Sequence, residues 1–162
     1  MCDHDPFNEP ETAHNRAREL MVEPFFWDCA DERAPFGSDE GSEAYYEWRD
    51  WRENNPAKPL TECLSWILDG NLSGYNESLC EEEQIERDLS NPSDAFLADH
   101  YDMFTLDTTI IATALGQLMD EGTIDTEAKQ YVNVAIRRQS YPGVHEYLAE
   151  TLTAIQRVVD AA

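Results

Sequence analysis

The sequence has few cysteines and lacks the short spacing that most cysteine-based sites share. Its four cysteines are far apart and form no Cys-x-x-Cys pair: Cys2, Cys29, Cys63 and Cys80. This spacing disfavours a zinc ribbon and a thioredoxin-type redox motif. We therefore expect reduced, mostly buried cysteines that pack as small apolar side chains.

Motifs of nucleotide and nucleophile chemistry are also missing. The chain contains no P-loop, no Gly-x-Gly-x-x-Gly phosphate cradle and no Gly-x-Ser-x-Gly elbow. A di-iron carboxylate bundle needs two Glu-x-x-His pairs, and only Glu11-Thr-Ala-His14 has that spacing. The sequence therefore predicts no cofactor and disfavours nucleotide-dependent chemistry.

Long apolar runs are absent as well. The first ten residues are polar and acidic, and no apolar run approaches the roughly 20 residues of a membrane span. We expect a soluble cytoplasmic protein of bacterial type that does not enter a membrane.

Positive charge is scarce, and negative charge is abundant. The 162 residues include 34 Asp and Glu but only 11 Lys and Arg, which gives a formal net charge of −23. Residues 1–107 carry 27 of the acids and 7 of the bases, so the first two-thirds of the chain is the acidic part. Such a surface repels nucleic acid and attracts cationic partners. We expect a basic protein partner and no direct binding of nucleic acid.

The hydrophobic pattern predicts helices throughout. Apolar residues recur at helical spacing, and no convincing two-residue alternation marks a strand. The expected helices cover about residues 11–22, 39–54, 59–69, 78–89, 106–121, 125–136 and 144–159, closed by breakers such as Pro24, Gly70 and Gly122. We predict an all-α fold of about six to eight helices in a single domain, 1–162. An irregular acidic part, 1–104, would pack on three antiparallel helices in 105–162.

One loop has the spacing of a calcium site. Oxygen-bearing residues stand at positions 1, 3, 5 and 9 of a twelve-residue stretch between two expected helices: Asp69, Asn71, Ser73 and Glu77. Gly74 fits the sharp turn of an EF-hand loop, which this stretch faintly resembles. Position 12, however, is Cys80 where the bidentate Glu is required. A capped helix–loop–helix turn explains the same composition, and we favour it.

A second group of candidates surrounds a bend rich in aromatic and acidic residues. The Pro35-Phe36-Gly37 bend would bring five carboxylates together: Asp28, Asp31, Glu32, Asp39 and Glu40. Clustered carboxylates can hold a divalent cation or act as an acid and base pair, so a metal-assisted hydrolase is one hypothesis. The same residues can equally cap helices, and we favour that structural role.

The stretch that follows carries a family resemblance. Together with Glu47-Trp48-Arg49-Asp50-Trp51-Arg52, the aromatic segment resembles a group of uncharacterised bacterial proteins sometimes associated with WGR-type domains, over about residues 23–70. The chain has no Trp-Gly-Arg tripeptide, and the resemblance implies no activity. Arg49 and Arg52 nevertheless join the five carboxylates as candidate binding residues.

The function that we predict is a non-enzymatic interaction or regulatory module. It would bind a cationic partner through the acidic surface between Asp28 and Asp88. A special case is a nucleic-acid mimic, in which two carboxylate rows imitate phosphates: Glu40, Glu43, Glu47 and Asp50, and Glu81, Glu82, Glu83, Glu86 and Asp88. Plain solvation or adaptation to high salt would also explain these rows.

Overall fold

The computed structural model describes residues 6–91, 93, 95–99 and 101–162, and within these residues the chain is helical without strands. Seven α-helices are present in this part of the chain: α1 Asn15–Leu20, α2 Asp39–Asn54, α3 Leu60–Ile67, α4 Glu82–Ser90, α5 Met103–Glu121, α6 Lys129–Gln139 and α7 Ala149–Ala161. Short 3-10 turns connect them at Pro10–Thr12, Pro24–Trp27, Leu72–Gly74, Glu77–Cys80, Thr126–Ala128 and Glu146–Leu148. The all-α prediction is confirmed.

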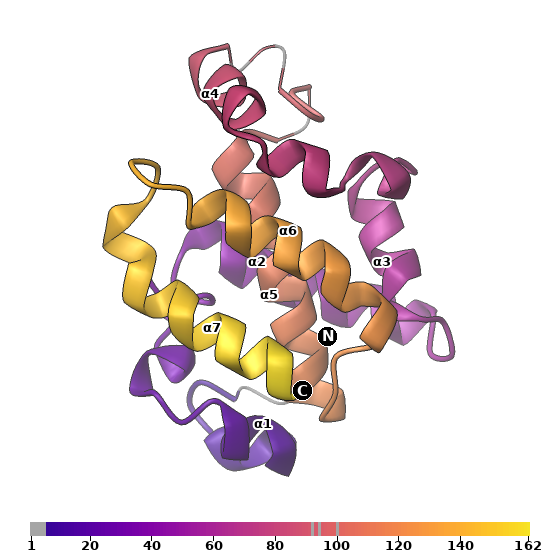
Figure 1. Ribbon diagram of the computed structural model, residues 1–162. Coiled ribbons are helices and arrows are strands. Elements are labelled where there is room, and N and C mark those ends of the chain that lie inside the picture. Colours follow the sequence, from indigo (N-terminus) through magenta and orange to yellow (C-terminus); the bar gives the residue numbers. More distant parts are fainter. Residues whose placement is uncertain (1–5, 92, 94, 100) are drawn as a thin grey trace.

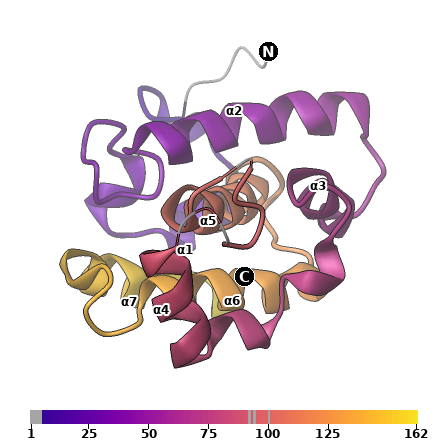
Figure 2. The same ribbon diagram turned by 90° about the horizontal axis from the view of Figure 1, so that it is seen from above.

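Helix α5 is the centre of the molecule. Figure 2 views it nearly end-on, with α2 on one side and α6 and α7 on the other (Figure 1 gives the side view). Every residue from Leu106 to Met119 is buried. Neighbouring helices therefore cover α5 on all sides, and it has no solvent-facing stripe over this range. The three C-terminal helices are also not all antiparallel, since α6 and α7 cross α5.

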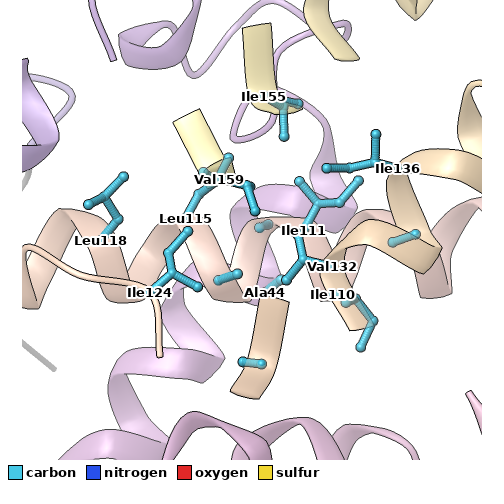
Figure 3. Close-up of a cluster of buried hydrophobic side chains, with 14 of the residues drawn as sticks. Ala44, Ile110, Ile111, Leu115, Leu118, Ile124, Val132, Ile136, Ile155 and Val159 are labelled. Carbon is cyan, nitrogen blue, oxygen red and sulfur yellow. The ribbon is translucent and has the colours of Figure 1, made fainter. Parts of the chain in front are cut away.

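One hydrophobic core joins both parts of the chain. It extends from Ala17 to Val159 and includes residues of every α-helix except α4. Figure 3 shows Ile111 and Leu115 of α5 beside Ile155 and Val159 of α7. Because the same cluster contains Ala44 of α2, the acidic first part packs directly on the regular helices rather than forming a separate core.

A polar network fixes the inner face of α2 on the end of α5. Asp120 accepts hydrogen bonds from Tyr45 Oη at 2.8 Å and Trp48 Nε1 at 3.2 Å. Asp120 also accepts hydrogen bonds from Arg49 Nε at 3.2 Å and from Arg49 Nη2 at 3.0 Å. Four donors on one carboxylate set the rotation of α2 about its axis, and this rotation turns its acidic residues outward.

Helices α1, α4 and α6 begin later than the sequence predicts. Helix α1 begins four residues late, because His14 is its N-cap and accepts from the Arg16 amide. The helix expected from about residue 78 starts later: Asn76 caps a 3-10 turn at Glu77–Cys80, and α4 begins at Glu82 without a side-chain cap. The helix expected from about residue 125 begins as a 3-10 turn, and α6 starts at Lys129. The Asp125 carboxylate makes no capping bond there and accepts a hydrogen bond from the Leu60 amide at 2.8 Å.

Other helix ends agree with the sequence. Ser38 caps α2 by accepting from the Gly41 amide, and Gly122 closes α5 at φ +80°. Helix α5 begins at Met103, three residues before the expected start at 106. In the described residues, no helix combines the length and the apolarity that crossing a bilayer would need.

Candidate functional site

Several titratable groups with shifted pKa values lie in a sealed cluster between α4, α5 and α6. Arg138 donates to Asp107 from Nε at 3.1 and 3.2 Å, and to Asp88 and the Leu79 carbonyl from Nη1 at 3.1 and 2.6 Å. Tyr75 Oη donates to Asp107 at 2.6 Å. Burial raises the pKa of Asp107 to about 6 and, with the negative charge of Asp107 beside it, raises the pKa of Tyr75 well above its usual value.

This cluster resembles an active site by residue type, but a ligand cannot reach it. The side chains of Asp88 and Asp107 are 0% exposed, and that of Arg138 is 1% exposed. Perturbed pKa values mark functional sites only where substrate has access, and structural ion-pair networks perturb them as well. We therefore conclude that the cluster has a structural role: it joins three helices.

One set of accessible carboxylates lies on the outer face of α2. Glu40, Glu43, Glu47 and Asp50 recur every three or four residues and form one line along the helix, here called the α2 acidic row. Partial burial, and then the charges of Glu43 and Asp50, raise the pKa of Glu47. The row therefore holds like charges close enough to oppose one another.

Little positive charge is left inside the protein to neutralise this row. Seven of the nine arginines form ion pairs with other carboxylates: Arg16, Arg33, Arg49, Arg52, Arg137, Arg138 and Arg157. Within the described part of the chain, no ion pair involves a member of the α2 acidic row. Its charge consequently remains available to an external cation.

A groove of about 430 Å³ borders the beginning of the row. Glu32, Asp39 and Glu40 line it together with Arg33, Ser38, Phe104 and Tyr147. Tyr147 is 60% exposed, although it lies within the last expected helix, 144–159. The reason is that α7 begins only at Ala149, so Tyr147 belongs to the preceding 3-10 turn.

A second pocket, of about 230 Å³, lies farther along the row between α2 and α3. Its lining residues are Glu47, Trp66, Ile67, Asp69 and Tyr101. Trp66 is 55% exposed, which is unusual for so large an apolar side chain. The pocket therefore combines two carboxylates with two aromatic rings.

The structure divides the seven predicted binding residues into two groups. Glu32, Asp39 and Glu40 share the groove at the start of α2. The other four are occupied within the fold: Asp28 accepts from the Ala30 and Asp31 amides, Asp31 pairs with Arg33, Arg49 binds Asp120 and Arg52 pairs with Glu121. The five carboxylates thus do not form one cluster.

The loop with calcium-like spacing is built as a pair of 3-10 turns. The carboxylate of Glu77 pairs with Arg137 at 3.2 Å. Asn71 lies against Gly74, and the side chain of Asn76 accepts from the Ser78 amide. Across the residues that the structure describes, no group of three or more His, Cys, Asp or Glu side chains is arranged to hold a metal.

Sequence reasoning missed Trp66, Tyr101 and the Asp107–Arg138 pair as notable residues. A signal existed for two of them. Trp66 falls outside the apolar stripe of its helix, which predicts exposure, and Asp107 stands within an otherwise apolar run, which predicts a buried charge needing a partner. The position of Tyr101 in the same pocket as Trp66 has no local signal.

The cysteines are less uniformly buried than expected. Cys63 is buried and Cys80 is partly buried, but Cys29 is exposed. Cys2 lies outside the described residues. The prediction of mostly buried cysteines is therefore wrong for Cys29, which occupies the irregular loop between the Pro24–Trp27 turn and α2.

Comparisons with protein-family models, curated proteins and solved structures give no significant match to this chain. Any account of its function must therefore be based on the site itself.

Proposed function

We propose that this chain is a non-enzymatic interaction module that binds a basic protein segment along the α2 acidic row. The observation that supports the proposal is the arrangement of Glu40, Glu43, Glu47 and Asp50 in one line without an internal ion pair. The groove at one end and the aromatic pocket beside Glu47 give this line a shape that a flat charged surface lacks.

The energetic argument concerns repulsion within the row. Like charges three or four residues apart on a helix destabilise it by about 0.2–0.5 kcal/mol per pair. A bound cation removes this repulsion and adds its own attraction. Partial burial is the main cause of the raised pKa of Glu47, and the charges of Glu43 and Asp50 add to it. Binding of a cation therefore relieves a repulsion that destabilises the folded protein in its unbound state.

The alternative of a nucleic-acid mimic needs a longer track of charge. Helix α4 carries a second acidic set, Glu82, Glu83 and Glu86. In Figure 2, however, α2 and α4 lie on opposite sides of α5. A single duplex-like track would need both rows on one face, so the proposal favours a partner segment that follows α2 alone.

The test is the binding of a fluorescein-labelled peptide of alternating arginine and glycine, followed by fluorescence anisotropy at two salt concentrations. We expect binding that weakens as ionic strength rises, because exposed charges are screened over about 8–10 Å. The triple variant Glu40→Gln, Glu43→Gln, Asp50→Asn should weaken binding about tenfold, given roughly 0.2–1 kcal/mol for each exposed charge pair.

A matched control has the same change of charge on the other acidic helix. The variant Glu82→Gln, Glu83→Gln, Glu86→Gln should bind the peptide about as well as the unmodified protein. Equal losses in the two triple variants would contradict a site on α2 and point to general attraction by the acidic surface, as would be expected of a mimic.

A further inference from the structure

The fold itself contains a model for recognition of a guanidinium group. The guanidinium carbon of Arg49 lies 4.4 Å from the centroid of the Tyr45 ring while its nitrogens bind Asp120. Arg52 lies 4.8 Å from the Trp48 ring and pairs with Glu121 at 2.8 Å. In both cases an arginine is held by an aromatic face and a carboxylate together.

The pocket between α2 and α3 offers the same two chemical groups at the surface. Trp66 and Tyr101 supply the rings, and Glu47 and Asp69 supply the carboxylates. Its volume of about 230 Å³ is below the roughly 300–1,000 Å³ of pockets for drug-sized ligands. A single side chain suits this volume better than a nucleotide or a large metabolite does.

We propose that this pocket receives an arginine side chain of the basic partner segment. The guanidinium plane would stack on the exposed Trp66 ring while its N–H groups bind the carboxylates of Glu47 and Asp69. The inference rests on the proposed function, because the pocket lies beside the α2 acidic row and shares Glu47 with it. It goes further by naming one anchor residue in the partner and the place that holds it.

The groove at the other end of the row suggests the spacing of a second basic residue. Glu40 and Glu47 are seven residues apart on α2, or about 10 Å along the helix axis at 1.5 Å per residue. An extended peptide covers this distance in about three residues at 3.3 Å each. A segment with basic residues three positions apart should therefore reach both the groove and the pocket.

The test uses the peptide acetyl-Gly-Arg-Gly-Gly-Arg-Gly-amide and its counterparts in which citrulline or lysine replaces both arginines. Two-dimensional NMR follows the indole N–H signals, and the Trp66→Phe variant assigns the signal of Trp66. We expect this signal to shift with the arginine peptide, less with the lysine peptide and not with the citrulline peptide, which keeps the shape without the charge.

Two variants outside the acidic row measure the contribution of the pocket to binding separately from that of the row's charge. Trp66→Ala and Asp69→Asn should each weaken the arginine peptide about fivefold, the size expected for the loss of one exposed contact. Asn suits position 69 because its backbone is left-handed at φ +54°, a conformation that Asn and Asp tolerate. The control is Leu89→Ala, which removes an exposed apolar side chain from α4, away from the row, the groove and the pocket.

The outcomes separate the two proposals. If the α2 triple variant weakens binding while Trp66→Ala and Asp69→Asn do not, the arginine pocket is wrong and the interaction surface stands. If the α2 triple variant binds the peptide normally, the proposed function fails whatever the pocket variants do. Equal binding of the arginine and lysine peptides would overturn the guanidinium specificity.

Discussion

Arg138 donates through Nε to both carboxylate oxygens of Asp107, at 3.1 and 3.2 Å, and both side chains are sealed from solvent. Asp88 shares the same guanidinium from α4, so one cation balances two buried anions. Because a buried charge is costly without a partner, this group joins α4, α5 and α6 as a unit whose members depend on one another.

The first prediction concerns Arg138. The variant Arg138→Met keeps much of the side-chain volume but leaves two buried carboxylates without their cation, and it should lower the free energy of unfolding by about 3–5 kcal/mol. Urea unfolding followed by circular dichroism measures the change. The neighbouring variant Arg137→Met removes only an exposed ion pair with Glu77 and should cost about 0–1 kcal/mol. Similar losses in the two would contradict the role assigned to the buried cluster.

The second prediction concerns the pH dependence of stability. Burial raises the pKa of Asp107 to about 6, from 3.8 for the free side chain, so the folded protein binds a proton more tightly than the unfolded chain. The resulting stabilisation is fully present below about pH 4 and is lost as the pH rises through about 6, by up to roughly 3 kcal/mol.

The variant Asp107→Asn isolates this contribution, because it removes the proton-binding group and leaves the other carboxylates unchanged. The unmodified protein should lose more stability than the variant between pH 5 and pH 8, measured by urea unfolding at both values. A larger loss in the variant would show that the pKa of Asp107 is not raised.

The third prediction concerns the contact between α2 and α5. A Cβ atom at Gly116 would lie 2.9 Å from Trp48 Cδ1 and 3.0 Å from Tyr45 Cδ1, which is closer than such atoms approach. An alanine inside a helix is normally favourable by about 1 kcal/mol relative to glycine. We expect the opposite for Gly116→Ala, a loss of about 1–3 kcal/mol from the forced separation of the helices. A higher urea midpoint for the variant would mean that α2 can move away freely.

The fourth prediction concerns the thiols. Burial raises the pKa of Cys63 to about 12 and also raises the pKa of the partly buried Cys80, whereas Cys29 is exposed. In a Cys2→Ser background, Ellman's reagent should therefore label Cys29 rapidly in the native protein. Cys80 should react slowly, and Cys63 only on unfolding, because the thiolate is the reactive form. Rapid labelling of all three thiols in the native state would contradict the burial of Cys63.

The sequence by itself determined the helical class and several helix ends. Leu60, Cys63, Leu64 and Ile67 recur at the spacing of one helical face, and they are buried as expected. Ser38 and Gly122 mark the start of α2 and the end of α5, because capping depends on a few neighbouring residues and on one backbone angle. The candidate row on α2 could be predicted in the same way, since its four carboxylates belong to one helix.

Only the tertiary structure decided which polar residues are enclosed and which are available. Asp107 pairs with Arg138, which is 31 residues away in the sequence, and Asp120 pairs with Arg49, which is 71 residues away. Local residue spacing does not predict such distant pairs. The same holds for the pocket, where Trp66 and Tyr101 come together from separate elements. Helix periodicity fixes the face on which a side chain lies. The packing of α2, α3 and α5 determines what that face contacts. It places Arg49 and Arg52 in ion pairs with Asp120 and Glu121, while the α2 acidic row stays on the outer face of the helix.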